Sequence, residues 1–247
     1  MKKIPKWQVL FGILLIVLSI SVYYAHFLIF RDAHHIFIYL IGDVAFVFIE
    51  VLMVTLVLHQ LLHFREKKSL LNKLNMVIGA FFSEVGTELL RVFSDLDLEA
   101  GKVKGRLIVR SDWTEKDFLK VKKEFIRHAP KIDVNDENLS ELKNFLKGKR
   151  HFLLRLLENP NILEHDSFTD LLWSVFHLTE ELDYRGEITD LPDKDYGHLK
   201  GDMERVYSRL ISEWLDYVSH LKNSYPYLFS MTMRTNPFDS KASVIVK

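Results

Sequence analysis

The sequence predicts an all-α membrane protein, in which an N-terminal hairpin of two transmembrane helices is followed by a cytoplasmic helical bundle. Residues 7–29 include no formally charged side chain, and residues 36–62 include only Asp43 and Glu50. After Arg65 charged residues are frequent, apolar residues recur at helical spacing, and proline is rare. The change in composition near residue 64 therefore marks the boundary between a membrane part and a soluble part.

Three segments are expected along the 247-residue chain. They are a transmembrane hairpin (1–64, with spans at about 7–29 and 36–62), an amphipathic stalk helix (65–94) and a cytoplasmic helical domain (95–247, with a candidate mobile tail from about 240). Each span exceeds the roughly 20 residues that a helix needs to cross the hydrocarbon core. The first span is too long for the apolar part of a signal peptide and lacks a small-residue cleavage site, so we expect an uncleaved anchor.

The distribution of lysine and arginine predicts the orientation of the hairpin. Three lysines precede the first span and three basic residues follow the second, whereas only Arg31 lies between the spans. Because basic flanks stay in the cytoplasm, both termini are expected there. The absence of cysteine is consistent with a reducing compartment. Residues 74–86 resemble parts of prokaryotic membrane proteins, and this resemblance implies the prokaryotic cell membrane as the location of a multi-pass integral protein.

Polar residues inside the two spans are the first candidate site. Asp43 and Glu50 lie seven residues apart and share a helix face, as do Ser19 and His26 on the first span. In a hairpin centred between positions 34 and 35, His26 would lie opposite Asp43, and Ser19 opposite Glu50. Such pairs either hold the helices together by hydrogen bonds or, in an oligomer, place acidic rings along a cation or proton path.

Small residues in the stalk predict close helix packing. Apolar residues between positions 74 and 93 recur at spacings of three and four. Gly79, Ser83 and Gly86 form a narrow strip on the same helix. A glycine in a helix costs about 1 kcal/mol relative to alanine, so the strip indicates a surface that another helix approaches.

Four longer helices are expected in the cytoplasmic domain. Ser111 or Asp112 can cap a helix that runs to about residue 128, and Asn138 or Ser140 begins a second that ends before residue 159. The third and fourth are expected at 167–184 and at about 196–223. Helices of this length joined by short loops favour a bundle.

Two histidine and carboxylate pairs in this domain are weak candidates for metal ligands. His177 precedes Glu181 by four residues, and His198 precedes Asp202 by four, so each pair shares a helix face. The set is similar to the ligands of metal-binding four-helix bundles, although the paired Glu-x-x-His motifs of that class are absent. The alternative interpretation is ordinary solvated or core histidines. No cofactor is therefore predicted.

A basic stretch consists of Lys143, Lys147, Lys149 and Arg150. It is expected to be a solvated helix face, with contact to anionic lipid headgroups as the second interpretation. A formal net charge of zero and the absence of a recognisable motif argue against nucleic acid as a partner.

The sequence carries none of the common phosphate-binding, dinucleotide-binding, zinc-protease or serine-hydrolase motifs. The favoured function is a membrane-anchored assembly or interaction protein whose helical domain binds a cytoplasmic protein. The alternatives are an oligomeric cation or proton channel lined by Asp43 and Glu50, and a metal-dependent enzyme in the bundle. The expected partners are the lipid bilayer, further copies of the chain and one unidentified cytoplasmic protein.

Overall fold

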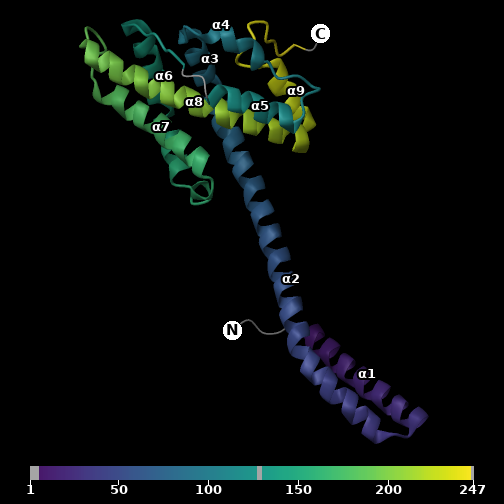
Figure 1. Cartoon of the computed structure of the whole chain (residues 1–247). Coiled ribbons are helices and arrows are strands. Elements are labelled where there is room, and N and C mark those ends of the chain that lie inside the picture. Colours follow the sequence, from purple (N-terminus) through teal and green to yellow (C-terminus); the bar gives the residue numbers. More distant parts are fainter. Residues whose placement is uncertain (1–5, 127–129, 246–247) are drawn as a thin grey trace. The chain divides into compact units, whose positions relative to one another are not determined.

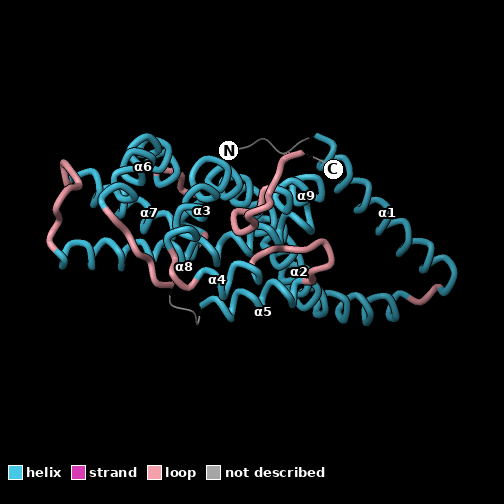
Figure 2. The backbone as a smooth tube through the Cα atoms, turned by 90° about the horizontal axis from the view of Figure 1, so that it is seen from above, coloured by secondary structure: helices cyan, strands magenta, loops and turns pink. Residues whose placement is uncertain are grey.

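The structure is a computed structural model that describes residues 6–126 and 130–245. The chain divides into two compact units, Met1–Lys67 and Lys68–Lys247. Every regular element in the described residues is helical (Figure 2). The single extended pairing among them is an isolated bridge between Asp97 and Ile132. The all-helical prediction is thus confirmed.

The first unit contains helix α1 (Lys6–Phe30) and the beginning of helix α2 (Ala33–Phe81). The segments Trp7–Phe30 and Ala33–Glu66 have the length and the apolar composition needed to cross a membrane. Their large apolar side chains are exposed rather than packed in a core. The prediction of two long apolar N-terminal helices is confirmed.

The turn between these helices is shorter than expected. It consists of Arg31, which has a positive φ of 50°, and Asp32. The Arg31 N–H donates to the Phe27 carbonyl at 2.8 Å, and the Asp32 carboxylate accepts from the His35 N–H at 3.1 Å. Since Asp32 caps α2 in this way, the second helix begins at Ala33 and not near residue 36.

The residues expected to form a single stalk helix are divided among three elements. Helix α2 ends at Phe81, a π-helical turn η1 follows (Phe82–Gly86), and helix α3 runs over Thr87–Leu96. Leu74, Ile78 and Val85 of this region are at most 3% exposed. Residues 74–93 therefore form part of the core of the second unit.

The remaining elements of the second unit are also helical. They are α4 (Ala100–Val103), η2 (Lys104–Arg106), α5 (Glu115–Ile126), α6 (Asp136–Leu157), η3 (Ile162–Glu164), α7 (Asp166–Tyr184), α8 (Asp193–Ser224) and α9 (Pro226–Arg234). Helix α8 is central, because it packs against α3, α5, α7 and α9, while α6 packs against α7 (Figure 1). The largest fully buried side chains include Trp214 and Tyr207 of α8 and Phe93 of α3. The predicted helical bundle is confirmed.

Two helix starts differ from the sequence prediction because other side chains cap them. The side chain of Asp117 accepts hydrogen bonds from the Thr114 N–H and hydroxyl, both at 2.7 Å, so α5 begins at Glu115. The Asn135 side chain accepts from the Asn138 N–H at 2.9 Å, so α6 begins at Asp136. Both observed helix starts lie within four residues of the predicted caps.

The end of the chain is hydrogen-bonded to the domain over part of the segment predicted to be mobile. The Ser243 N–H donates to the Arg234 carbonyl at 2.9 Å, and the Arg234 guanidinium donates to the Val244 carbonyl at 2.6 Å. Residues 246 and 247 lie outside the described residues.

Candidate functional site

Helices α7 and α8 bring the two histidine and carboxylate pairs together. The helices pack against each other and are joined by residues 185–192. Within each helix the histidine and the carboxylate lie about one turn apart. Because the two helices run in opposite directions, His177 lies level with Asp202, and Glu181 lies level with His198.

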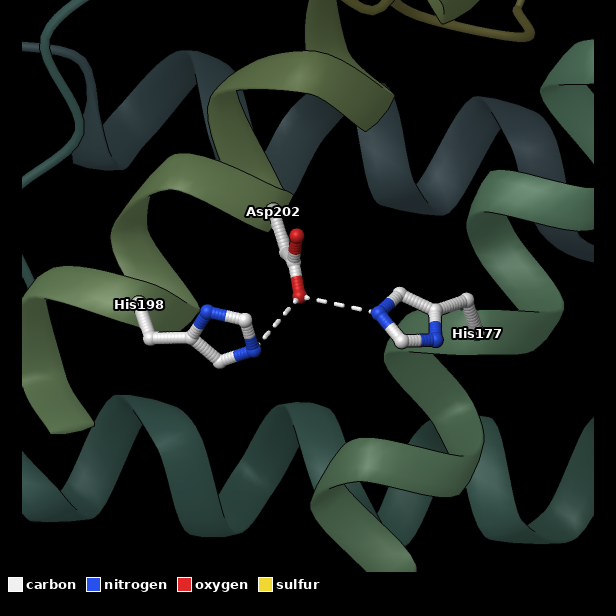
Figure 3. A group of neighbouring side chains, drawn as sticks. All are labelled: His177, His198 and Asp202. Carbon is white, nitrogen blue, oxygen red and sulfur yellow. Dashed lines mark ion pairs between the residues drawn. The ribbon is translucent and has the colours of Figure 1, made fainter.

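The four side chains form a square of contacts. Asp202 Oδ2 lies 3.4 Å from His177 Nε2 and 3.5 Å from His198 Nε2. Glu181 contributes the longer sides, since its carboxylate oxygens lie 3.9 Å from His177 Nε2 and 3.7 Å from His198 Nε2. Figure 3 shows the two imidazole rings pointing from different helices toward the same oxygen atom of Asp202.

Burial differs sharply across this cluster. The Asp202 side chain is only 2% exposed, whereas the His177 and His198 side chains are 48% and 51% exposed. Arg205 lies 3.0 Å from Asp202 Oδ1. The other oxygen, Oδ2, is buried and has no hydrogen-bond partner among the described residues. The cluster therefore consists of one buried, unsatisfied carboxylate oxygen beneath two solvent-accessible imidazoles.

Arg185 fixes the orientation of Glu181. Its guanidinium donates to Glu181 Oε2 at 2.6 Å and to both carboxylate oxygens of Asp195 at 2.7 Å. The hydrogen bond from Arg185 is the main reason that the pKa of Glu181 lies below its usual value. The same guanidinium lowers the pKa of Asp195. Glu181 is thus held as an oriented anion at the edge of the cluster.

Two of the three donor-atom separations are close to the spacing of ligand atoms around a metal ion. The donor atoms of His177, His198 and Asp202 all lie within 4.8 Å of one another. In a tetrahedral site with bonds of 2.0–2.1 Å, neighbouring ligand atoms are about 3.3 Å apart. The two distances between Asp202 and the histidines are close to this value. The third separation, between the donor atoms of the two histidines, is within 4.8 Å.

The outer residues Arg185, Asp195 and Arg205 were not singled out from the sequence. Arg185 follows Glu181 by four positions and Arg205 follows Asp202 by three, so helical spacing alone could have identified both. The role of Asp195 depends on its pairing with Arg185 across the loop between α7 and α8.

The structure gives Asp43 a partner other than the one expected. Tyr23 Oη donates to Asp43 Oδ2 at 3.3 Å, while the His26 ring stacks on His35 with centroids 6.1 Å apart. The expected pairing placed the turn near residues 34 and 35. The turn lies at residues 31 and 32 instead, so Asp43 lies beside an earlier part of α1 than expected. Among the described residues, Glu50 has no polar side-chain partner, Ser19 included.

The small residues in the second unit have different environments. A Cβ atom at Gly79 would meet Tyr217 of α8, so this glycine lies at a true helix contact. A Cβ atom at Gly86 would instead lie 2.6 Å from the ring of Phe82, four positions earlier in the same chain segment. Ser83 is exposed and borders a cavity that Tyr217 also lines. The predicted strip is thus a contact with α8 at Gly79 and a close contact within its own segment at Gly86.

The four basic residues of α6 have partners inside the domain. Lys147 pairs with Asp183, Lys149 with Glu84 and Arg150 with Glu180, at 2.9, 2.9 and 2.7 Å, and Lys143 donates to the Gly186 carbonyl. Arg150 also lies over the ring of Phe176. The contact of this stretch with lipid headgroups stays a prediction, since the Lys147 side chain is 61% exposed.

Fold and site together define an all-helical protein that has two long apolar N-terminal helices and a helical domain carrying a histidine and carboxylate cluster. The chain belongs to the MJ1433 family. Residues 70–234 match the family described as the C-terminal helical domain of uncharacterized protein MJ1433, and residues 2–62 match its N-terminal helical domain. The chain is 46% identical to uncharacterized protein MJ1433 of Methanocaldococcus jannaschii over 240 residues, which are 97% of this chain and 96% of that protein. No solved structure matches it significantly.

Proposed function

We propose that this chain is a membrane-anchored interaction protein, in which the two apolar helices hold the helical domain at the cytoplasmic face of the cell membrane. The observation that carries the proposal is the exposure of the N-terminal unit. Leu10, Ile29 and Phe48 are 70%, 73% and 74% exposed, and they represent apolar side chains distributed over both helices. Leaving one such side chain in water rather than burying it costs about 1.5–3 kcal/mol.

A bilayer is the environment that fits this surface. Segments of 24 and 34 residues are about 36 and 51 Å long, and the hydrocarbon core is about 30 Å thick. A helix that is apolar on every side needs an apolar environment on every side. Within each helix the backbone hydrogen bonds are internal, which is the condition for crossing hydrocarbon.

Sequence features support the orientation. Trp7 at one end of the hairpin and Tyr24 and Tyr39 toward the other are residue types enriched at the membrane interface. The basic residues flank the hairpin on the side of its two open ends, and this distribution supports a cytoplasmic location for the second unit.

A role in protein binding is supported by two exposed aromatic residues on α7. Trp173 and Tyr184 are 55% and 84% exposed. They are eleven positions apart, which is about three helical turns, so they share one face of the helix. Tyrosine and tryptophan are enriched in protein interfaces because one side chain supplies both apolar area and a polar group.

Cysteine labelling in membranes tests the anchoring and the orientation. The native chain has no cysteine, so single variants such as His34→Cys and Glu137→Cys carry no background. We expect a membrane-impermeant maleimide to label position 34 in intact cells and position 137 only after permeabilisation. The chain should also stay in the pellet after alkaline carbonate extraction. Release of the full-length chain into the soluble fraction would exclude an integral anchor.

Site-specific photo-crosslinking in native membranes tests the interaction role. A photoreactive residue at position 173 is expected to give one reproducible crosslinked protein band. Leu98, which is 71% exposed and lies outside α7, is the matched control position. Equal crosslinking patterns at positions 98 and 173 would argue against a specific binding face on α7.

A further inference from the structure

We propose that His177, His198 and Asp202 bind one divalent first-row transition metal ion, with Glu181 beside the site as a weaker contributor. This inference is independent of membrane anchoring, because it rests on the geometry of α7 and α8. The three donor atoms lie within 4.8 Å of one another, and they come from two helices that pack together. Figure 3 shows that Asp202 points toward both imidazoles.

The unsatisfied oxygen of Asp202 is the second observation that supports a metal ion at this site. A buried polar atom without a partner is destabilising, and native proteins leave few of them. Arg205 contacts Oδ1 only, so Oδ2 remains without a donor. The nearest ring nitrogens, at 3.4 and 3.5 Å, are beyond the usual range of a good N–H···O hydrogen bond. A cation among the three atoms would satisfy the carboxylate oxygen and both imidazole nitrogens at once.

The ligand set selects the class of ion. Two imidazole nitrogens and one carboxylate oxygen suit zinc, iron(II) and related ions, whereas Mg²⁺ and Ca²⁺ prefer oxygen ligands alone. Three protein ligands leave at least one coordination position for water or another molecule. Because both imidazoles are about half exposed, this position has access to solvent.

Arg205 and Arg185 have the positions expected of residues that orient the ligands of a metal. Arg205 holds the non-ligating oxygen of Asp202, so that Oδ2 is directed at the histidines. Arg185 holds Glu181, whose oxygens are 3.7 and 3.9 Å from the same ring nitrogens. Outer residues of this kind typically change metal affinity by about 10-fold to 100-fold when they are replaced.

The test is a zinc titration of the full chain in nanodiscs after its metal has been removed with a chelator. We expect one Zn²⁺ per chain. His177→Gln, His198→Gln and Asp202→Asn should each weaken binding by about 100-fold or more, and Glu181→Gln by about 10-fold. His151→Gln on α6 and Glu213→Gln on α8 are the controls, because they remove an exposed histidine and a buried carboxylate outside the cluster. Both controls should bind zinc like the unaltered chain.

Thermal unfolding of the same samples guards against misfolded variants. His177→Gln removes a half-exposed side chain, so its melting temperature without metal should match that of the unaltered chain. Zinc should raise the melting temperature of the unaltered chain and of both controls, but not that of His177→Gln. Zinc binding below one ion per chain, or equal affinity in the unaltered chain, His177→Gln and Asp202→Asn, would overturn the proposal. Displacement of zinc by millimolar Mg²⁺ would overturn the assignment to a transition metal.

Discussion

Tyr217 of α8 lies directly against the backbone of Gly79 of α2, where a Cβ atom would come within 3.0 Å of the tyrosine Oη. The next two contacts, with ring carbons of Tyr217, would be 3.4 and 3.5 Å and thus ordinary. The Tyr217 ring is itself stacked on Phe82, with centroids 5.3 Å apart. The hydroxyl oxygen is therefore the one atom that makes a methyl group at position 79 unfavourable.

Gly79→Ala should consequently depend on the hydroxyl of Tyr217. Alanine gains about 1 kcal/mol of helix propensity, and in the unaltered chain the contact with Oη offsets this gain. In a Tyr217→Phe background the contact is absent, so we expect Gly79→Ala to raise the melting temperature by about 2–4 °C. The melting temperatures of the two single variants and the double variant measure this coupling.

Gly148 on α6 supplies the control for this prediction, because no atom lies within 4 Å of a Cβ atom built there. Gly148→Ala should be stabilising by about 1 kcal/mol in both backgrounds. An equal gain from Gly79→Ala and Gly148→Ala in the unaltered chain would mean that Tyr217 moves aside freely.

The hydrogen bond between Tyr23 and Asp43 should stabilise the hairpin only modestly. Hydrogen bonds between membrane helices contribute about 0.6 kcal/mol on average and up to about 1.7 kcal/mol. We expect Tyr23→Phe and Asp43→Asn to be coupled by an energy of this size in a double-mutant cycle of hairpin unfolding in a lipid bilayer. Tyr24→Phe, which changes the adjacent exposed tyrosine, should show no coupling to Asp43→Asn. Coupling through Tyr24 rather than Tyr23 would contradict the register of the hairpin.

The buried Glu213 makes stability depend on pH. Glu213 is only 3% exposed, and this burial raises the pKa of its carboxyl group despite a hydrogen bond from Ser167. Below the unfolded pKa of about 4.3 the carboxyl group is protonated in both states and has no electrostatic cost. As the pH rises above that value the unfolded state ionises first, so stability falls until the folded pKa is passed.

Glu213→Gln should therefore become more stabilising, relative to the unaltered chain, between pH 4 and pH 7. The difference in melting temperature between variant and unaltered chain, measured across this range, checks the sign. Glu137→Gln alters an exposed carboxylate of α6 and should show a much smaller dependence on pH. A constant effect of Glu213→Gln at all pH values would indicate that the residue has an ordinary pKa.

The order of the helices could be predicted because their signals are local. Apolar periodicity located α6, α7 and α8, while the two helix starts that differed depended on the side chains of Asp117 and Asn135. The register between the two helices of the hairpin could not be predicted, because it depends on the exact position of the turn. A positive φ at Arg31 has no clear sequence signal, although Asp32 could have been identified as the cap of the second helix.

The sequence predicted the two histidine and carboxylate pairs separately, but not that the pairs come together in one cluster. Spacing of four placed His177 with Glu181 and His198 with Asp202, which are contacts within one helix. Their meeting depends on the register between α7 and α8, and that register follows from the length and geometry of residues 185–192. The partners of the basic residues on α6 could not be predicted from the sequence either, since Lys149 pairs with Glu84, 65 positions earlier.

Glu50 supplies the last prediction, because its carboxylate has no polar side-chain partner among the described residues of the hairpin. A carboxylate near the centre of a bilayer costs about 2.5–3.5 kcal/mol unless it faces a partner or a cavity. We expect a second copy of the chain to supply that partner, so the mass in nanodiscs, corrected for bound lipid, should correspond to at least two copies. Glu50→Leu should shift this mass toward the monomer, whereas Phe48→Leu, a change at a 74% exposed neighbour, should not.

The same mass also separates an anchor from a pore. Two helices cannot enclose a path for ions, so conduction lined by Asp43 and Glu50 requires several copies. If four or more copies are present, Glu50→Gln should leave the assembly intact and abolish any cation current through it. A dimer would exclude the pore and leave Glu50 as a helix-pairing group. A monomer would exclude both the pore and the pairing between copies, and would leave Glu50 without a protein partner in the span.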